Sequence, residues 1–164
     1  MRYEYDCCVY FKVLADGSYI FLALYVDDML VATKSKQEIV KLKSLLSSEF
    51  DMKDLGVAKK ILRIEIHRDR GAGKLWLSQK GYLKKVLERF SILDEKPVNT
   101  PLSAHFKLSL QLCPSSDKEL EYMFKVPYAN AIGCLMYLMV CTRPDISHAV
   151  NVVSRYTADP GKEH

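Results

Sequence analysis

Two adjacent carboxylates stand inside an apolar run in the stretch Leu24-Tyr25-Val26-Asp27-Asp28-Met29-Leu30. Apolar residues continue on both sides, from Tyr19 to Ala32, without a Gly or a Pro. The pattern predicts a tight β-hairpin whose first strand ends at Val26 and whose second strand starts at Met29. The two Asp residues would form its tip, because Asp tolerates turn conformations that β-branched residues do not.

The Asp27–Asp28 pair is a candidate metal site. Two like charges at the end of buried strands repel each other, and each resists leaving water. A hard cation such as Mg²⁺ takes carboxylate oxygens and leaves positions open for phosphates. An isolated Asp-Asp pair between two strands is more often a simple polar turn. Whether this pair is a metal site or a polar turn therefore depends on other features of the sequence.

The composition is that of a folded chain with one domain or two small ones. It has 164 residues, of which 49% are hydrophobic and 27% charged. No apolar run is long enough to cross a membrane, and the N-terminus lacks a signal-peptide hydrophobic segment. Its five Cys form no Cys-x-x-Cys pair and its four His are far apart, so zinc is not expected. We therefore expect an intracellular protein, cytoplasmic or nuclear, that is not secreted and has no membrane partner.

Positive charge is concentrated between Lys59 and Arg89. This segment holds ten Lys or Arg against three Asp or Glu, a net +7, which leaves −3 for the rest of a chain of net charge +4. Such a segment suits a polyanionic partner. The alternative is a solvated Lys-rich face without a partner.

Hydrophobic periodicity predicts strands first and helices later, an α+β fold. The expected strands are Cys8–Lys12, Tyr19–Val26, Met29–Ala32, Leu62–His67 and Lys74–Leu77. The expected helices run from a capping box at Ser35–Glu38 to Phe50, from an N-cap at Ser78 to Phe90, from Pro127 through Met139, and from Thr142 through Val153. Four prolines make residues 95 to 126 rich in loops.

Many sequence blocks resemble the Pol polyproteins of copia-type retrotransposons, most closely the plant TNT-type elements. Tyr25-Val26-Asp27-Asp28 is similar to the active-site hairpin of reverse transcriptases. The other blocks are Asp51–Gly56, Leu75–Gln79 with Tyr82, Val86–Phe90, Pro97–Leu102, Val126–Tyr128, Gly133–Tyr137, Cys141–Ile146 and Pro160–His164. Together they cover nearly the whole chain, in the order found in that family.

The resemblance implies part of a reverse transcriptase domain. Residues 1–77 would be the C-terminal half of a right-hand polymerase palm, an antiparallel sheet with a helix. Residues 78–164 would be the mainly helical thumb and the start of the connection towards RNase H. The implied activity is RNA-directed DNA synthesis by two-metal nucleotidyl transfer with Mg²⁺, or Mn²⁺ in its place. The implied partners are an RNA template, a DNA primer, and the fingers, palm and RNase H portions of the polyprotein.

The resemblance also implies roles for individual residues. Asp27 and Asp28 would be catalytic and bind the metal, and Tyr25 and Val26 would border the nucleotide and the primer terminus. Leu62, Arg63 and Ile64 would form a segment like the primer grip. The basic residues expected to bind nucleic acid are Lys59, Lys60, Lys80, Lys84, Lys85 and Arg89.

Two features depart from the family. A further catalytic Asp lies on an earlier palm strand in relatives, and none of Glu4, Asp6 and Asp16 has its sequence context. We therefore expect no activity and no tightly bound cofactor from this chain alone. Relatives usually have Gly at the position of Arg63, and Gly in a strand often marks close approach of a backbone or a ligand.

Two other functions stay open. The chain could be a non-enzymatic nucleic-acid-binding remnant of a degenerate transposon, or a subunit that supplies the Asp pair to a partner. We also expect poor solubility, because the strand Tyr19–Val26 would lack its neighbouring palm strand and expose an unpaired edge.

Overall fold

The computed structural model describes residues 1–103 and 105–164. The chain forms two compact units, Met1–Ile61 and Leu62–His164. Antiparallel sheets and helices occur together, so the expected α+β class is confirmed. The predicted boundary between palm and thumb at residue 77 rests on the resemblance to a family, and it stays a prediction.

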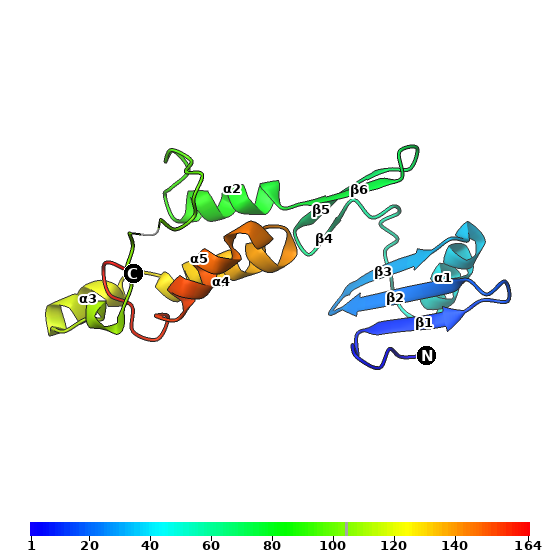
Figure 1. Cartoon of the computed structure of the whole chain (residues 1–164). Helices are drawn as coiled ribbons and strands as arrows, with labels where there is room; N and C mark the ends of the chain where they lie inside the picture. Colours follow the sequence, from blue (N-terminus) through cyan, green and yellow to red (C-terminus); the bar gives the residue numbers. More distant parts are fainter. Residues whose placement is uncertain (104) are drawn as a thin grey trace. The chain divides into compact units, whose positions relative to one another are not determined.

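The first unit is a three-stranded antiparallel sheet with one helix (Figure 1). The strands are β1 (Val9–Val13), β2 (Tyr19–Tyr25) and β3 (Asp28–Thr33), in the order β1-β2-β3. Helix α1 (Lys36–Glu49) follows, and Ser35 caps it by accepting a hydrogen bond from the Glu38 N–H at 3.4 Å. Only this half of the predicted capping box forms, because the Glu38 carboxylate instead accepts from Lys41 Nζ at 2.7 Å.

Strand β2 is the central strand of this sheet, so the expectation that it exposes an unpaired edge is wrong. β1 pairs with it from Val9 opposite Ala23 to Val13 opposite Tyr19. A turn at Asp16–Ser18 closes this hairpin, where Gly17 has φ 77° and the Asp16 carboxylate accepts from Ser18 N–H at 2.9 Å. Among the described residues, the edges of the sheet are β1 and β3.

Packing between the first sheet and α1 is loose. Ile20 and Leu22 face the helix, and with Leu42 and Leu45 they line an open cavity of about 350 Å³. No side chain of α1 is fully buried. The first unit therefore buries little apolar area, which limits the free energy that stabilises it.

The second unit holds the other helices. The short strand β4 (Lys60–Ile61) precedes this unit. The elements of the unit are β5 (Ile64–Asp69), β6 (Lys74–Ser78), α2 (Lys80–Arg89), the 3₁₀ turn η1 (Leu110–Leu112), α3 (Asp117–Phe124), α4 (Tyr128–Cys141), the 3₁₀ turn η2 (Pro144–Ile146) and α5 (Ser147–Ser154). The second sheet has the order β4-β5-β6. The buried side chains of this unit are those of Gln79, Val86, Met123, Ile132, Leu138 and Val150.

The predicted strand Leu62–His67 begins too early. Leu62 and Arg63 have φ values of 47° and 62° and form a two-residue turn between β4 and β5, so the strand starts at Ile64. Apolar and polar residues alternate through the turn as they do in the strand. This alternation contains no information on the sign of φ, so the turn could not be recognised from it.

Ser78 is not the N-cap of α2. Gln79 takes that position, although its side chain makes no capping hydrogen bond to the helix, and the Ser78 hydroxyl donates to the Glu65 carboxylate at 3.0 Å. The other Glu65 oxygen accepts from the Gly81 N–H at 3.1 Å. A strand residue therefore satisfies the first turn of the helix, as a carboxylate at a helix N-terminus does well.

The stretch 95–126 contains a helix that sequence reading missed. Helix α3 begins after Ser116, whose hydroxyl accepts from the Glu119 N–H at 3.4 Å. The Glu119 carboxylate accepts from the Ser115 N–H at 2.9 Å. The Ser-x-x-Glu signal of a capping box was present but hidden among prolines. Residue 104, which also falls in this stretch, lies outside the described residues.

Within the described part of the chain, no single helix has the length and hydropathy to span a membrane. The bent pair α3 and α4, with an angle of 50° between them, reaches that composition only when taken together.

Candidate active-site hairpin and basic surface

The β2–β3 hairpin presents the two adjacent carboxylates. Tyr25 pairs directly with Asp28, so the connecting loop consists of Val26 and Asp27. The predicted tip, Asp27 and Asp28, is therefore displaced by one residue, and Asp28 is the first residue of β3. Register in a hairpin is set by the loop length, and a two-residue loop here continues the pairing without a gap.

The loop holds a strained residue. Val26 has φ 53° and is 87% exposed. A β-branched side chain in the left-handed region is a genuine outlier that costs about 1–2 kcal/mol. Strain of this kind is concentrated at functional sites, where the surrounding structure enforces it. The conformation thus marks the loop that carries Asp27.

The two faces of the first sheet differ. Strand alternation and the register place Tyr25 and Asp28 on the face opposite α1, together with Phe11, Tyr19 and Phe21. The rings of Tyr19 and Phe21 stack with centroids 5.8 Å apart, and both are exposed. The uncovered face therefore ends in a carboxylate beside the strained loop.

The donor set at the hairpin suits part of a magnesium site. Asp27 and Asp28 are both exposed and offer hard carboxylate oxygens, and Mg²⁺ is usually held by one or two carboxylates with phosphates and water completing its shell. In residues 1–103 and 105–164, no group of three His, Cys, Asp or Glu ligands close enough to hold one ion includes either Asp. By the chemistry of their oxygens, these two residues suit two of the ligands of a Mg²⁺ ion.

The segment expected to resemble a primer grip is the Leu62–Arg63 turn. The Tyr137 hydroxyl of α4 donates a hydrogen bond to the Leu62 carbonyl oxygen. The Arg63 guanidinium lies 5.8 Å from the ring of Tyr82, which meets the Tyr137 ring edge-on at 5.3 Å. Burial and a hydrogen bond with Cys134 raise the pKa of Tyr82 to about 12. The turn is thus anchored on α2 and α4.

The positive φ of Arg63 is a conformation that glycine adopts without steric cost. We expect Arg63→Gly to be more stable than Arg63→Ala by about 1 kcal/mol, because only the alanine keeps a Cβ in the left-handed region. Both variants remove the guanidinium, so the comparison isolates backbone strain. Urea unfolding of the two variants measures the difference, and equal free energies of unfolding would contradict it.

Helix α2 presents a basic face. Lys80, Lys84, Lys85 and Arg89 are all exposed, whereas Val86 on the opposite side is buried. Lys84 Nζ lies 3.8 Å from the Glu88 carboxylate, a weak surface pair. Lys59 and Lys60 are also exposed, in and just before β4. These basic side chains are therefore exposed to solvent, and their role in binding nucleic acid stays a prediction.

Two other sequence blocks, Leu75–Gln79 and Cys141–Ile146, are joined by a hydrogen bond. The Thr142 hydroxyl donates to Oε1 of Gln79 at 2.8 Å, although 63 positions separate the two residues. Gln79 is only 4% exposed. The Arg143 guanidinium donates hydrogen bonds to both carboxylate oxygens of Asp145 at 2.7–3.1 Å. These hydrogen bonds hold the pKa of Asp145 below its usual range. Sequence reading singled out these blocks without finding the contacts between them.

A family model described as reverse transcriptase (RNA-dependent DNA polymerase) matches residues 2–104, which include the whole hairpin and its sheet. The chain belongs to the reverse transcriptase family. The tobacco (Nicotiana tabacum) retrovirus-related Pol polyprotein from transposon TNT 1-94 is 57% identical over 97% of this chain. The predicted resemblance to copia-type Pol polyproteins of plants is therefore confirmed.

Two further relatives are shorter proteins. A putative transposon Ty5-1 protein of Saccharomyces cerevisiae is 33% identical over 99% of this chain, and an uncharacterised mitochondrial protein of Arabidopsis thaliana is 39% identical over 86%. The chain spans 12% of the tobacco polyprotein, 50% of the yeast protein and 55% of the Arabidopsis protein. No solved structure matches the chain.

Proposed function

We propose that this chain supplies the catalytic hairpin and thumb of an RNA-directed DNA polymerase encoded by a copia-type retrotransposon. The observation that carries the proposal is the β2–β3 hairpin. It sets Asp27 in a strained two-residue loop and Asp28 beside it, at the end of a sheet face that α1 does not cover. An open face ending in adjacent carboxylates can receive a nucleic-acid end and a metal-bound triphosphate.

The proposed roles follow from position. Asp27 and Asp28 would hold Mg²⁺, or Mn²⁺ in its place, with the remaining ligands supplied by another part of the polymerase. The bound metal would stabilise the charge that develops on the transferred phosphoryl group. Tyr25 and Val26 border the same end of the sheet and would contact the primer terminus and the nucleotide. The turn at Leu62–Arg63, followed by Ile64, would position the primer backbone.

The proposed partners are an RNA template, a DNA primer and the remaining portions of a Pol polyprotein. Such partners require an intracellular location, in the cytoplasm or the nucleus. The test is primer extension on a primed RNA template after mixing this chain with a polypeptide that carries fingers and the earlier palm strands. Template-dependent extension that needs both polypeptides supports the proposal, and no extension over any ratio of the two contradicts it.

The exposed basic face of α2 favours one more function, binding of nucleic acid without catalysis. This function needs no second metal-binding strand, and it applies whether or not the polymerase assembles. The proposed ligand is an RNA–DNA hybrid held through its phosphates, without strong sequence preference, because Lys and Arg on a helix face contact phosphates rather than base edges.

We expect the chain to bind an RNA–DNA hybrid weakly and with a steep dependence on salt. Charge reversal of Lys80, Lys84 and Lys85 to Glu should lower the affinity. It should also reduce the slope of log K against log[salt] by about one for each phosphate that the variant no longer neutralises. Fluorescence anisotropy at several salt concentrations measures both quantities.

The matched control reverses three exposed lysines of the first unit, Lys34, Lys36 and Lys41, which changes the net charge equally. The control should bind more tightly than the α2 variant at every salt concentration. Identical curves for the two variants would show that only net charge matters, and would remove α2 as the binding face.

A further inference from the structure

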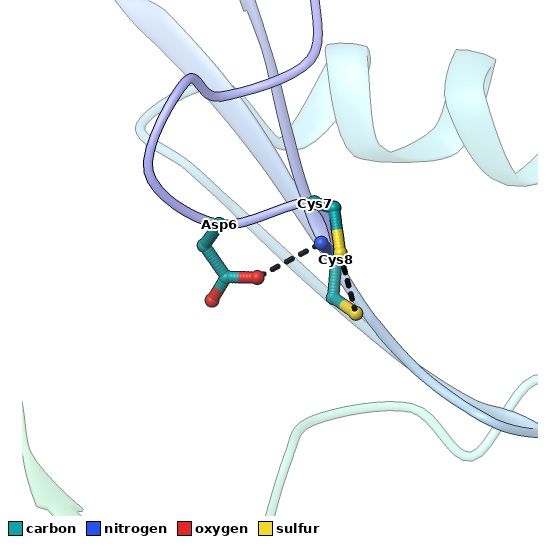
Figure 2. A group of neighbouring side chains, drawn as sticks. All are labelled: Asp6, Cys7 and Cys8. Carbon is teal, nitrogen blue, oxygen red and sulfur yellow. Dashed lines mark hydrogen bonds between the residues drawn. The ribbon is translucent and has the colours of Figure 1, made fainter.

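Two adjacent thiols and a carboxylate gather at the beginning of β1. Asp6, Cys7 and Cys8 are all exposed, and their ligand atoms all lie within 4.8 Å of one another (Figure 2). The two Sγ atoms are 4.0 Å apart, and both cysteines are free. It is the only such group among residues 1–103 and 105–164. The expectation that zinc is not bound rested on the lack of a Cys-x-x-Cys pair and on widely separated His, and it stays a prediction.

The spacing of the sulfurs is that of a metal centre. A tetrahedral zinc ion with bonds of about 2.3 Å to two thiolates holds those sulfurs about 3.8 Å apart. The present separation needs to close by only a few tenths of an ångström. A disulfide instead requires the sulfurs to approach to about 2.05 Å and closes a ring across a single peptide bond, far from the usual geometry.

Hydrogen bonds hold the segment in place before any ion binds. The Asp6 carboxylate accepts from the Cys8 N–H at 2.8 Å, which turns this side chain toward the thiols (Figure 2). Nε of Arg2 donates to the Cys7 carbonyl oxygen at 2.9 Å, and the Leu24 N–H donates to that of Cys8 at 2.8 Å. These hydrogen bonds tie the turn that carries the three ligands, just before β1, to Arg2 and to β2, which lowers the entropic cost of binding.

We propose that Asp6, Cys7 and Cys8 bind one thiophilic divalent cation of the zinc and cadmium type. Two thiolates and one carboxylate oxygen are its protein ligands, and water takes the fourth position of the tetrahedron. Soft thiolates select such a cation over Mg²⁺, which prefers an all-oxygen shell. The site is thus chemically separate from the carboxylate pair at the hairpin, and it does not depend on polymerase function.

The experiment titrates the reduced 164-residue chain with Cd²⁺ alone. It follows the ultraviolet charge-transfer absorption from thiolate to cadmium and the heat of binding. We expect one Cd²⁺ per chain. Cys7→Ser and Cys8→Ser should each weaken binding by more than the roughly 10–100-fold loss that follows removal of a supporting hydrogen bond. Asp6→Asn should weaken it by a smaller factor, because both thiolates remain.

Cys113→Ser is the matched control, since it removes one free thiol from the second unit. It should bind Cd²⁺ with the affinity of the parent chain. Circular dichroism should show the same fold for every variant, because the substituted side chains of the site are exposed. Parent affinity in the Cys7→Ser/Cys8→Ser double variant would overturn the site, and so would a stoichiometry of one Cd²⁺ per two chains.

Discussion

Residues 1–164 alone are expected to extend no primer on an RNA template, with either Mg²⁺ or Mn²⁺. Two-metal phosphoryl transfer needs carboxylates from more than one strand, and the β2–β3 hairpin supplies only Asp27 from its loop and Asp28 from β3. In the described part of the chain no third ligand joins Asp27 and Asp28. Gel analysis of an end-labelled primer measures extension, and extension that disappears in Asp27→Asn would contradict the prediction.

The same variant tests the hairpin in a complemented polymerase. With the fingers and earlier palm strands supplied by a second polypeptide, Asp27→Asn should abolish extension, because the substitution removes the negative charge of a proposed metal ligand and keeps its shape. Asp54→Asn is the matched control, since its carboxylate binds Lys43 at 2.6 Å elsewhere in the first unit. It should keep its activity. Equal loss in both variants would indicate damage to the fold rather than to the site.

Gly161→Ala is expected to destabilise the second unit by about 2–3 kcal/mol, the cost of forcing an extra carbon into a packed position. Gly161 is buried, and a Cβ built on it would overlap the carbonyl oxygen of Leu112. Backbone atoms cannot rotate aside as a side chain can. The Gly161 N–H also donates to Nδ1 of His164 at 2.8 Å, and the His164 ring stacks on Tyr156 at 3.9 Å.

Thermal unfolding followed by circular dichroism measures this effect. At about 4–8 °C per kcal/mol for a domain of this size, Tm should fall by roughly 8–24 °C. The control is Gly133→Ala in α4, where a Cβ would meet nothing within 4 Å. Alanine has the higher helix propensity, so this control should gain about 0.5–1 kcal/mol. Equal Tm values for the two variants would contradict the argument from close packing.

The candidate site could be located from sequence because its signals are local. Tyr25–Asp28 between apolar flanks predicts both the hairpin and its carboxylates, and Ser35 with Glu38 marks the start of α1. Such patterns reflect the conformational preferences of neighbouring residues, which do not require a partner elsewhere in the chain. The sequence also located the exposed lysines of α2, since helical periodicity separates them from the buried Val86.

Tertiary structure decided what depends on contacts between distant residues. Pairing of β1 with β2 made the apolar strand central rather than an edge. The Leu62 carbonyl oxygen accepts a hydrogen bond from Tyr137, 75 positions away. Leu62 lies in a turn of positive φ, where the alternation of apolar and polar residues predicted a strand. Glu65 satisfies the first turn of α2 at Gly81, and Gln79 meets Thr142. A local pattern specifies which face of a helix or strand is apolar. Only tertiary packing determines which other element covers that face, and whether its contacts can hold a residue in an unfavourable backbone conformation.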